Sequence, residues 1–545
     1  MASLPSIPSE LFAEISAQCD RQTLLALALS CRALSWLSLA MLWRELDSVS
    51  PLLYTLPSDA ITRFKSHLEG RNISKPHRII DVIRELTSAD LVRYRLYAPF
   101  VHRLRVSVLN QWYGREVTDD GWRYFARANP GPLPNLRRLD ASLHLDSESS
   151  MMTPIHLLLG SAFEGLTVLI RISRDSDPIR TLKPSLSDLL VSLPLQCPQF
   201  ARLHLHQGRP AAYMSDALAD ALCGLRHLVD VRTDVPLLPR AFAHLRSVPT
   251  LTTLFVHACA ADYPTGALTD DRSETQPFAA LSTLTITSDS TECVTSVIEY
   301  AHPPRLEYIH VTASGQPTSR EMMALSATMG SLPARATLER LYVDVPRSPC
   351  SLTPPFFEPL YAIPHLRVLV LKGSCYASLD NAEFMRMARA WPHMEYLQLC
   401  HFRPPPGTIT LAGLVESVRV CRSLTSLRLR LADISHSECA GLLARIKRLG
   451  LGARPPGLPP TPRLLRLGIG SPSVDGEDVD AVAEILAMAL PPLYSSLIHS
   501  WGPQVSGYRV MPAVLPPPAS RREVMARRWA AVRERYNARL AEVSR

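Results

Sequence analysis

A short apolar rhythm that recurs along most of the chain limits the possible folds more than any other feature. Each instance is an apolar residue, two variable residues, a second apolar residue, one variable residue and a third apolar residue. Such triplets begin at Val101, Leu136, Phe200, Leu251, Leu281, Leu306, Leu338, Leu366, Met394, Leu424 and Leu464. Segments at Leu166 and Leu225 keep only the first pair. From Leu104 to Leu467, a span of 363 residues, twelve steps average about 30 residues, slightly more than the usual leucine-rich unit.

The segments between these triplets have helical spacing. Phe384, Met387, Ala388 and Trp391 lie on one face of a helix of 3.6 residues per turn, as do equivalent residues after Leu411. A strand and a helix therefore alternate, and stacking such units buries their leucines against one another. We expect an α/β fold: a leucine-rich-repeat-like solenoid over 99–510, with parallel strands on its concave side and helices on its convex side.

The residues between the leucines should point away from the core and line the concave surface, because side chains alternate along a strand. Tyrosine and arginine dominate the energetics of many interfaces. The candidate substrate-binding residues are Arg202, His204, Phe255, Tyr308, Arg340, Tyr342, Tyr396 and Arg428. This mixed polar and aromatic surface favours a protein or peptide partner over a small molecule. The alternative is an ordinary solvated sheet face.

The first 48 residues have a different pattern, that of three short helices. Leu11 and Ile15 lie one turn apart, and Pro8 suits a first helical turn. Asp20 is a candidate N-cap for a second helix whose leucines occupy more than one face. A module of about 40 residues cannot bury all of this apolar surface by itself, so part of it should meet a partner or the next domain.

The run IPSELFAEISAQCDRQTLLALALSCRALSWLSLAMLWREL, Ile7 to Leu46, resembles the F-box of fungal F-box proteins. It has the proline, the L-x-x-x-I turn, the leucine-rich second helix, the cysteine and the late tryptophan of that motif. The departures are Ile7, where leucine is commoner, and Cys19, where an apolar residue usually closes the first helix. The resemblance implies binding to the Skp-type adaptor of cullin-based (SCF-type) ubiquitin ligases. The adaptor-binding positions it implies are Pro8, Leu11, Ile15, Leu24, Leu25 and Leu29. The alternative is a small helical cap on the solenoid.

The expected organisation is an F-box over 1–48, a helical linker or cap over 49–98, the solenoid, a proline-rich link over 511–518 and a basic amphipathic helix over 519–545. The apolar stripe of that last helix is Met525, Trp529, Val532, Tyr536, Leu540 and Val543. This helix is expected either to cover the last repeat or to dock an acidic partner, serve as a nuclear-targeting signal or contact RNA.

The distribution of charge argues against nucleic-acid binding by the part of the chain that precedes residue 519. Of the net charge of +8, the segment 519–545 supplies +5 through eight arginines and three glutamates, which leaves +3 for the rest. The eleven cysteines are odd in number and form no C-x-x-C pair, which favours reduced thiols in a cytoplasmic or nuclear protein. No secretory signal is evident, and Leu24 to Trp43 is interpreted as soluble helices because Arg32 interrupts it.

The sequence contains no motif of a catalytic site. His204 and His206 lack a third metal ligand of fixed spacing. A glycine pattern that begins at Gly468 imitates a dinucleotide-binding loop, but Ser473 occupies the position of its third glycine. We therefore expect no enzyme activity, no metal and no cofactor. The first hypothesis is a non-catalytic substrate receptor of a ubiquitin ligase. The others are a leucine-rich-repeat scaffold with a degenerate F-box, and nucleic-acid binding through the tail.

Overall fold

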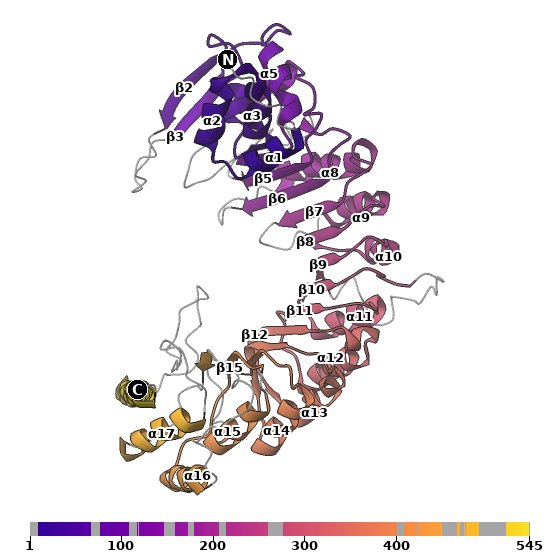
Figure 1. Cartoon of the computed structure of the whole chain (residues 1–545). Helices are drawn as coiled ribbons and strands as arrows, with labels where there is room; N and C mark the ends of the chain where they lie inside the picture. The colour runs from indigo at the N-terminus through magenta and orange to yellow at the C-terminus, as the bar shows by residue number, and fades with distance from the viewer. Residues whose placement is uncertain are drawn as a thin grey trace. The chain divides into compact units, whose positions relative to one another are not determined.

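The computed structural model describes residues 9–66, 77–107, 117, 119–145, 158–172, 179–206, 214–259, 276–399, 408–421, 423–448, 466–468, 474, 476–489 and 519–543. The chain divides into two compact units, Met1–His257 (unit 1) and Ala258–Arg545 (unit 2). Both units combine parallel strands with helices, the α/β repeat fold expected from the sequence (Figure 1). The division itself falls within the segment expected to be one solenoid.

Unit 1 begins with three helices, as the sequence predicts. They are α1 (Ser9–Ala17), α2 (Arg21–Ser30) and α3 (Arg32–Arg44). The side chain of Asp20 caps α2 by accepting a hydrogen bond of 2.7 Å from the backbone N–H of Thr23. Trp36 packs edge-on against Phe100, and Trp43 stacks on Tyr97 with ring centroids 4.4 Å apart. These aromatic pairs join α3 to α5 (Val92–Tyr97) and to the 3₁₀ turn η1 (Ala98–Phe100).

The segment 49–98 is less helical than expected. Besides α4 (Ser50–Leu53), α5 and η1, it contains an antiparallel pair of strands, β2 (Ile61–Ser66) and β3 (His77–Val82). Ile80 and Val82 are both buried, which is the period-two pattern of a half-buried strand. Arg84 joins this region by bonding to both Asp59 and Asp90 at 2.8 and 2.9 Å.

The main sheet of unit 1 is parallel, and its strands follow one another in chain order. Its strands are β1 (Glu45–Leu46), β4 (Arg103–Ser107), β5 (Arg138–Leu145), β6 (Gly165–Ile172), β7 (Arg202–His206), β8 (Asp230–Pro236) and β9 (Thr253–Ala258). The helices that follow β4, β6, β7 and β8 are α6 (Asp119–Arg127), α8 (Ile179–Gln196), α9 (Ser215–Gly224) and α10 (Pro239–Ser247). Figure 1 shows α8, α9 and α10 along one side of the strands, the arrangement predicted for a repeat array.

Unit 2 repeats this arrangement. Its strands, also parallel and in chain order, are β10 (Thr283–Ser288), β11 (Tyr308–Ala313), β12 (Arg340–Leu352), β13 (Val368–Ala377), β14 (Tyr396–Gln398), β15 (Ser426–Arg428) and β16 (Arg466–Gly468). Its helices are α11 (Thr291–Ala301), α12 (Ser319–Ser331), α13 (Pro354–Phe357), α14 (Asn381–Ala390), α15 (Leu411–Val420), α16 (His436–Arg448), α17 (Val479–Ala489) and α18 (Ala519–Val543), with 3₁₀ turns η3 (Pro333–Ala336), η4 (Pro359–Ala362) and η5 (Gly476–Asp478).

Side-chain polar contacts lock neighbouring repeats together between α14 and α15. The amide of Asn381 donates to the hydroxyl of Thr410 at 3.0 Å and accepts from its backbone N–H at 2.9 Å. Gly413 lies so close that a Cβ there would come within 2.1 Å of the Asn381 side-chain oxygen. Any larger residue at 413 would therefore displace this contact between repeats.

The predicted alternation of the strands is confirmed for most positions. The leucine and valine triplets are buried, whereas β7, β9, β11 and the start of β12 expose the intervening residues. We call the sheet face with these intervening residues the open face. Val370, Gln398 and Ser426 were expected on it as exposed residues, but the structure buries all three.

The basic C-terminal helix, α18, packs against α17. Trp529, Val532 and Tyr536 of the predicted stripe are buried. Arg535 pairs with Asp480, and Arg528 donates to the backbone carbonyl of Val474. The structure thus matches the interpretation of α18 as a cover for the last repeat. The side chains of Met525 and Val543, and the link 511–518, lie outside the described part of the chain.

Candidate functional site

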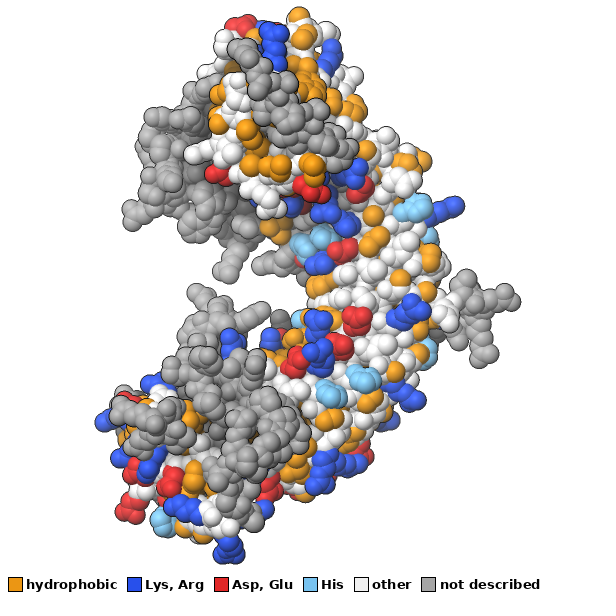
Figure 2. All heavy atoms as spheres, in the orientation of Figure 1, with side chains coloured by type: hydrophobic (Ala, Val, Ile, Leu, Met, Phe, Trp, Pro, Cys, Tyr) orange, Lys and Arg blue, Asp and Glu red, His pale blue; other side chains and the backbone are white. Residues whose placement is uncertain are grey.

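The N-terminal helices expose an unusual amount of apolar surface. Leu11 and Ile15 on α1 are 52% and 53% exposed, and Leu25 and Leu29 on α2 are 52% and 80% exposed. We call these four residues the α1–α2 surface. Within each helix the two residues are four apart, so they lie on one face. Figure 2 shows hydrophobic side chains at the surface of this part of unit 1. Large exposed apolar groups of this kind are typical of interaction sites.

Of the six predicted adaptor-binding residues, four form the α1–α2 surface and Leu24 is buried. Leu24 is only 6% exposed and belongs to the core of the helical module, so it offers little surface to a partner. Pro8 lies outside the described residues. Trp36 on α3, by contrast, is 52% exposed and was not among the predicted positions. Its exposure depends on how α3 packs against Phe100, which residue type and helical spacing do not reveal.

On the open face of unit 1, several charged groups lie in pairs. Arg103 on β4 bonds to Asp140 on β5 at 2.7 Å. On β8, Asp230 accepts a 2.9 Å hydrogen bond from Arg232, and Nε2 of His204 on β7 lies 2.9 Å from the Asp230 carboxylate. Burial by itself raises the pKa of Asp230, but the bonds from His204 and Arg232 outweigh it and hold that pKa below its ordinary value.

Two arginines of the same face flank a glycine. Arg138 on β5 and Arg202 on β7 are the register partners of Gly165 on β6. Neither guanidinium forms an ion pair within the described part of the chain. Phe255 on β9 lies further along, with its ring 6.2 Å from that of His206. The structure therefore places Arg202, His204 and Phe255 on one face, as predicted.

The open face of unit 2 is aromatic. Tyr308 and His310 on β11 and Tyr342 on β12 form a cluster with ring centroids 5.3 to 6.5 Å apart. Arg340 is the register partner of Tyr308. Tyr396 on β14 donates a 3.1 Å hydrogen bond to the side-chain oxygen of Gln398. Arg428 on β15 is the register partner of that glutamine. All five predicted residues of this unit thus lie on its open face.

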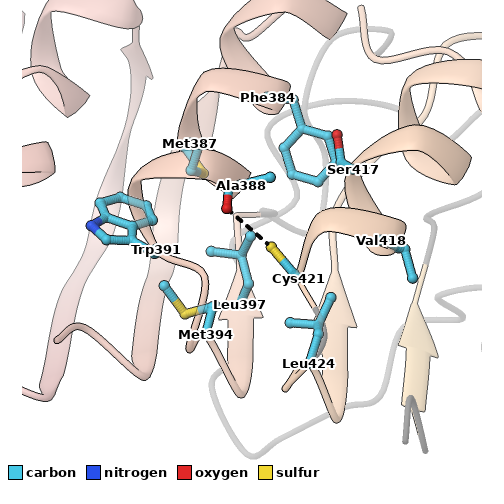
Figure 3. Close-up of a pocket in the computed structure, with 10 residues that line it drawn as sticks. All are labelled: Phe384, Met387, Ala388, Trp391, Met394, Leu397, Ser417, Val418, Cys421 and Leu424. Carbon is cyan, nitrogen blue, oxygen red and sulfur yellow. Dashed lines mark hydrogen bonds between the residues drawn. The ribbon is translucent and has the colours of Figure 1, made fainter. Parts of the chain in front are cut away.

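The cavities near these strands do not resemble an active site. One, of about 10 Å³, lies between α14 and α15 and is lined mainly by apolar side chains and sulfur atoms (Figure 3). It has room for at most one water molecule. The other, of about 310 Å³, is an open polar groove lined by Glu339, His365, Arg367, His393, Glu395 and Ser423. Arg367 bonds to Glu395 and lies 3.7 Å from Glu339, so the charges in this groove are largely paired.

Three further features bear on the sequence predictions. Within the described ranges, no group of three or more His, Cys, Asp or Glu residues could hold a metal ion. No helix in the described part of the chain is long and apolar enough to cross a membrane. The nine cysteines whose side chains the structure describes are free thiols.

Comparisons with known proteins give no family. No family model matches the chain, and no curated protein matches it. Among solved structures, it is similar to a chain in the crystal structure of the yeast Rad7 and Elc1 complex. The two are 14% identical with a TM-score of 0.34, over 74% of this chain and 89% of that one. This TM-score is too low for the likeness to support an argument about this protein.

Proposed function

We propose that the protein is a non-catalytic substrate receptor of a cullin-based ubiquitin ligase. The N-terminal module binds a Skp-type adaptor through the α1–α2 surface, and the open faces of the repeats hold a protein substrate. The exposure of Leu11, Ile15, Leu25 and Leu29 carries this proposal, because four large apolar side chains on two short helices are expensive to leave in water.

The repeats support the second half of the proposal. Their open faces present tyrosine, histidine and arginine side chains, the residue types that dominate protein interfaces. In this function the protein supplies proximity and no chemistry. Tethering a substrate beside the ubiquitin-carrying subunits raises its effective concentration to the millimolar range typical of short flexible linkers, on the order of 1 mM.

The aromatic contacts at the end of the module fit this role. Trp36 and Trp43 pack on Phe100 and Tyr97, so α3 is fixed to the structure that precedes β4. The last residues of the module, Glu45 and Leu46, form β1 and pair with β4. An adaptor bound to α1 and α2 would therefore be held in a fixed position relative to the open face of unit 1.

The test is co-purification of the full chain with a Skp-type adaptor and cullin. We expect the Leu11→Ala, Leu25→Ala double variant to lose the adaptor. If each leucine is a hot spot of about 2 kcal/mol or more, the pair loses roughly a thousandfold in affinity. The matched control is Val191→Ala, Leu195→Ala, which removes apolar residues of α8 that are 51% and 86% exposed.

The control variant should still bind the adaptor, and both variants should melt like the wild type because the altered side chains are exposed. A double variant that retains the adaptor would place the contact elsewhere on the chain. Wild-type protein that never recovers an adaptor would instead favour a repeat scaffold that works without a ligase.

A further inference from the structure

The aromatic cluster on the open face of unit 2 is built like the centre of a protein interface. The ring centroid of Tyr342 lies 5.3 Å from that of Tyr308 and 5.7 Å from that of His310. All three side chains are half-buried, so each ring is held by its neighbours while part of it faces solvent. Burial lowers the pKa of His310, so its imidazole is neutral at pH 7 and adds no charge.

Arg340 lies in this cluster with no acidic register partner. Its register partners are Tyr308 on β11 and Val368 on β13, and neither is charged. The guanidinium is exposed and makes no hydrogen bond or ion pair within the described ranges. Some other arginines near the strands are paired with acids, such as Arg103 with Asp140 and Arg367 with Glu395. Arg340 therefore has all of its donors available to a ligand.

The other charges on this face partly compensate one another. Asp344 and Lys372 are register partners four residues beyond Arg340 and Val368 on β12 and β13. Burial raises the pKa of Asp344, and the nearby Lys372 opposes this effect only in part. Lys372 therefore partly offsets the charge of Asp344, whereas Arg340 has no acidic register partner.

We propose that the open face of β11–β13 binds a protein segment in which an Asp or Glu side chain lies next to a bulky apolar side chain. The carboxylate pairs with Arg340, whose planar guanidinium can donate two parallel hydrogen bonds to it. The apolar group packs on Tyr308 and Tyr342, which removes water from around the ion pair. This names the substrate class of the receptor proposed above and rests on that function, although the binding itself requires only this chain.

Aromatic rings beside an arginine also suit single-stranded nucleic acid, but the neighbouring acids oppose it. Glu307 and Glu339 directly precede β11 and β12, and Asp344 lies at the other end of the cluster. A ligand with one phosphate per nucleotide would place negative charge near these groups as well as near Arg340. A segment with a carboxylate at a single position avoids this repulsion.

The test uses the purified full chain without any adaptor. A displayed library of random peptides is selected on the wild-type chain, and the strongest binder is synthesised with a fluorescent label for anisotropy titration. We expect enriched peptides to carry Asp or Glu beside Leu, Phe, Tyr or Trp. Arg340→Gln should weaken the labelled peptide by roughly tenfold or more, because a hydrogen bond to a charged group is lost. Tyr342→Ala should weaken it as well.

The matched control is Arg335→Gln, which removes an exposed arginine from η3 in the same unit without touching the open face. It should bind the peptide like the wild type, and thermal melting should show that both arginine variants stay folded. Enrichment of basic or uncharged peptides, no enrichment at all, or unchanged binding by Arg340→Gln would each overturn the proposal. So would a labelled oligothymidine that binds more tightly than any peptide and depends on Arg340.

This assay separates the two proposals. Loss of adaptor co-purification with intact peptide binding would refute only the ligase function. Adaptor binding without an acidic peptide would refute only the substrate class.

Discussion

The open faces of the two units follow the same strand pattern but have different chemistry. In unit 1 several outward cations lie beside carboxylates, such as Arg103 with Asp140 and His204 with Asp230, although Arg138 and Arg202 form no ion pair within the described ranges. In unit 2 the outward side chains of Tyr308, His310 and Tyr342 form an aromatic cluster, and Arg340 has no acidic register partner. The first surface pairs many of its own charges. The second combines aromatic rings with a cation that has no ion-pair partner among the described residues, which suits an acidic and apolar ligand.

The largest expected effect concerns the buried side of the strands, where the two units should behave alike. Leu341→Ala with Leu369→Ala removes two buried leucines from β12 and β13. Each such truncation costs about 2–5 kcal/mol, so the pair should lower the free energy of unfolding by roughly 4 kcal/mol or more. Tyr342→Ala with Tyr396→Ala, on the open face, should cost clearly less. Urea denaturation followed by circular dichroism measures both. A greater loss from the tyrosine pair would mean that the strand faces are assigned backwards.

A smaller effect on the free energy of unfolding is expected from the paired charges of unit 1. Asp230→Asn removes the acceptor shared by His204 and Arg232 and should cost about 1–3 kcal/mol near neutral pH, because these are hydrogen bonds to a charged group. The pKa of Asp230 lies below its ordinary value of 3.8 in the folded protein. Its stabilisation is therefore complete above that pH and is lost as the pH falls through the lower, folded-state pKa.

Denaturation of wild type and Asp230→Asn at a series of pH values measures this dependence. The difference in unfolding free energy should shrink as the solution becomes more acidic than the ordinary aspartate pKa. A difference that grows on acidification would show that Asp230 is destabilised by its surroundings, and the description of unit 1 as self-paired would have to be abandoned.

The smallest expected changes in the free energy of unfolding concern two arginines, one paired and one without a partner among the described residues. Arg103→Gln breaks the bond to Asp140 and should cost about 0.2–1 kcal/mol, less at high salt, as is usual for partly exposed ion pairs. Arg340→Gln should change the free energy of unfolding by less than about 0.5 kcal/mol, because it removes no side-chain hydrogen bond or ion pair with the described residues. Parallel urea titrations at low and high salt test this pair of expectations. Equal losses would show that Arg340 is also structural, which would weaken its assignment as a ligand-binding group.

The repeat pattern predicts most of the strands, because the triplets record which side chains the array must bury. The pattern does not locate a strand correctly in two places, where the triplet contains an aromatic or polar residue in place of an aliphatic one. At β6 the buried triplet is Phe163, Leu166 and Val168, so Leu166 is its second member and not its first. In β8 the buried triplet is Leu228, Val231 and Thr233, and its polar last member hides the pattern. That shift also explains why Asp230 and Arg232 were not recognised as open-face residues.

Other features depend on tertiary contacts that residue spacing does not encode. Leu24 and Leu25 are adjacent leucines on α2, yet packing of the module buries one and exposes the other. The strand pair β2 and β3 lies in a segment whose apolar residues have no regular spacing. The sequence of this segment therefore does not distinguish strands from helices. Some residues that alternate outward along their strands are nevertheless buried, namely Val370, Gln398 and Ser426. The alternation determines which face of the sheet a residue lies on, but it does not determine what covers that face.

The central claim is that one chain holds an adaptor through α1 and α2 and a protein segment through the open face of unit 2 at the same time. The direct measurement is retention of a purified Skp-type adaptor on beads that carry the acidic peptide selected above. The adaptor should be retained only when the wild-type chain is added. Retention should be lost both with the Leu11→Ala, Leu25→Ala double variant and with Arg340→Gln. Adaptor that is never retained by peptide-bound chain, or that displaces the chain from the peptide, would contradict it.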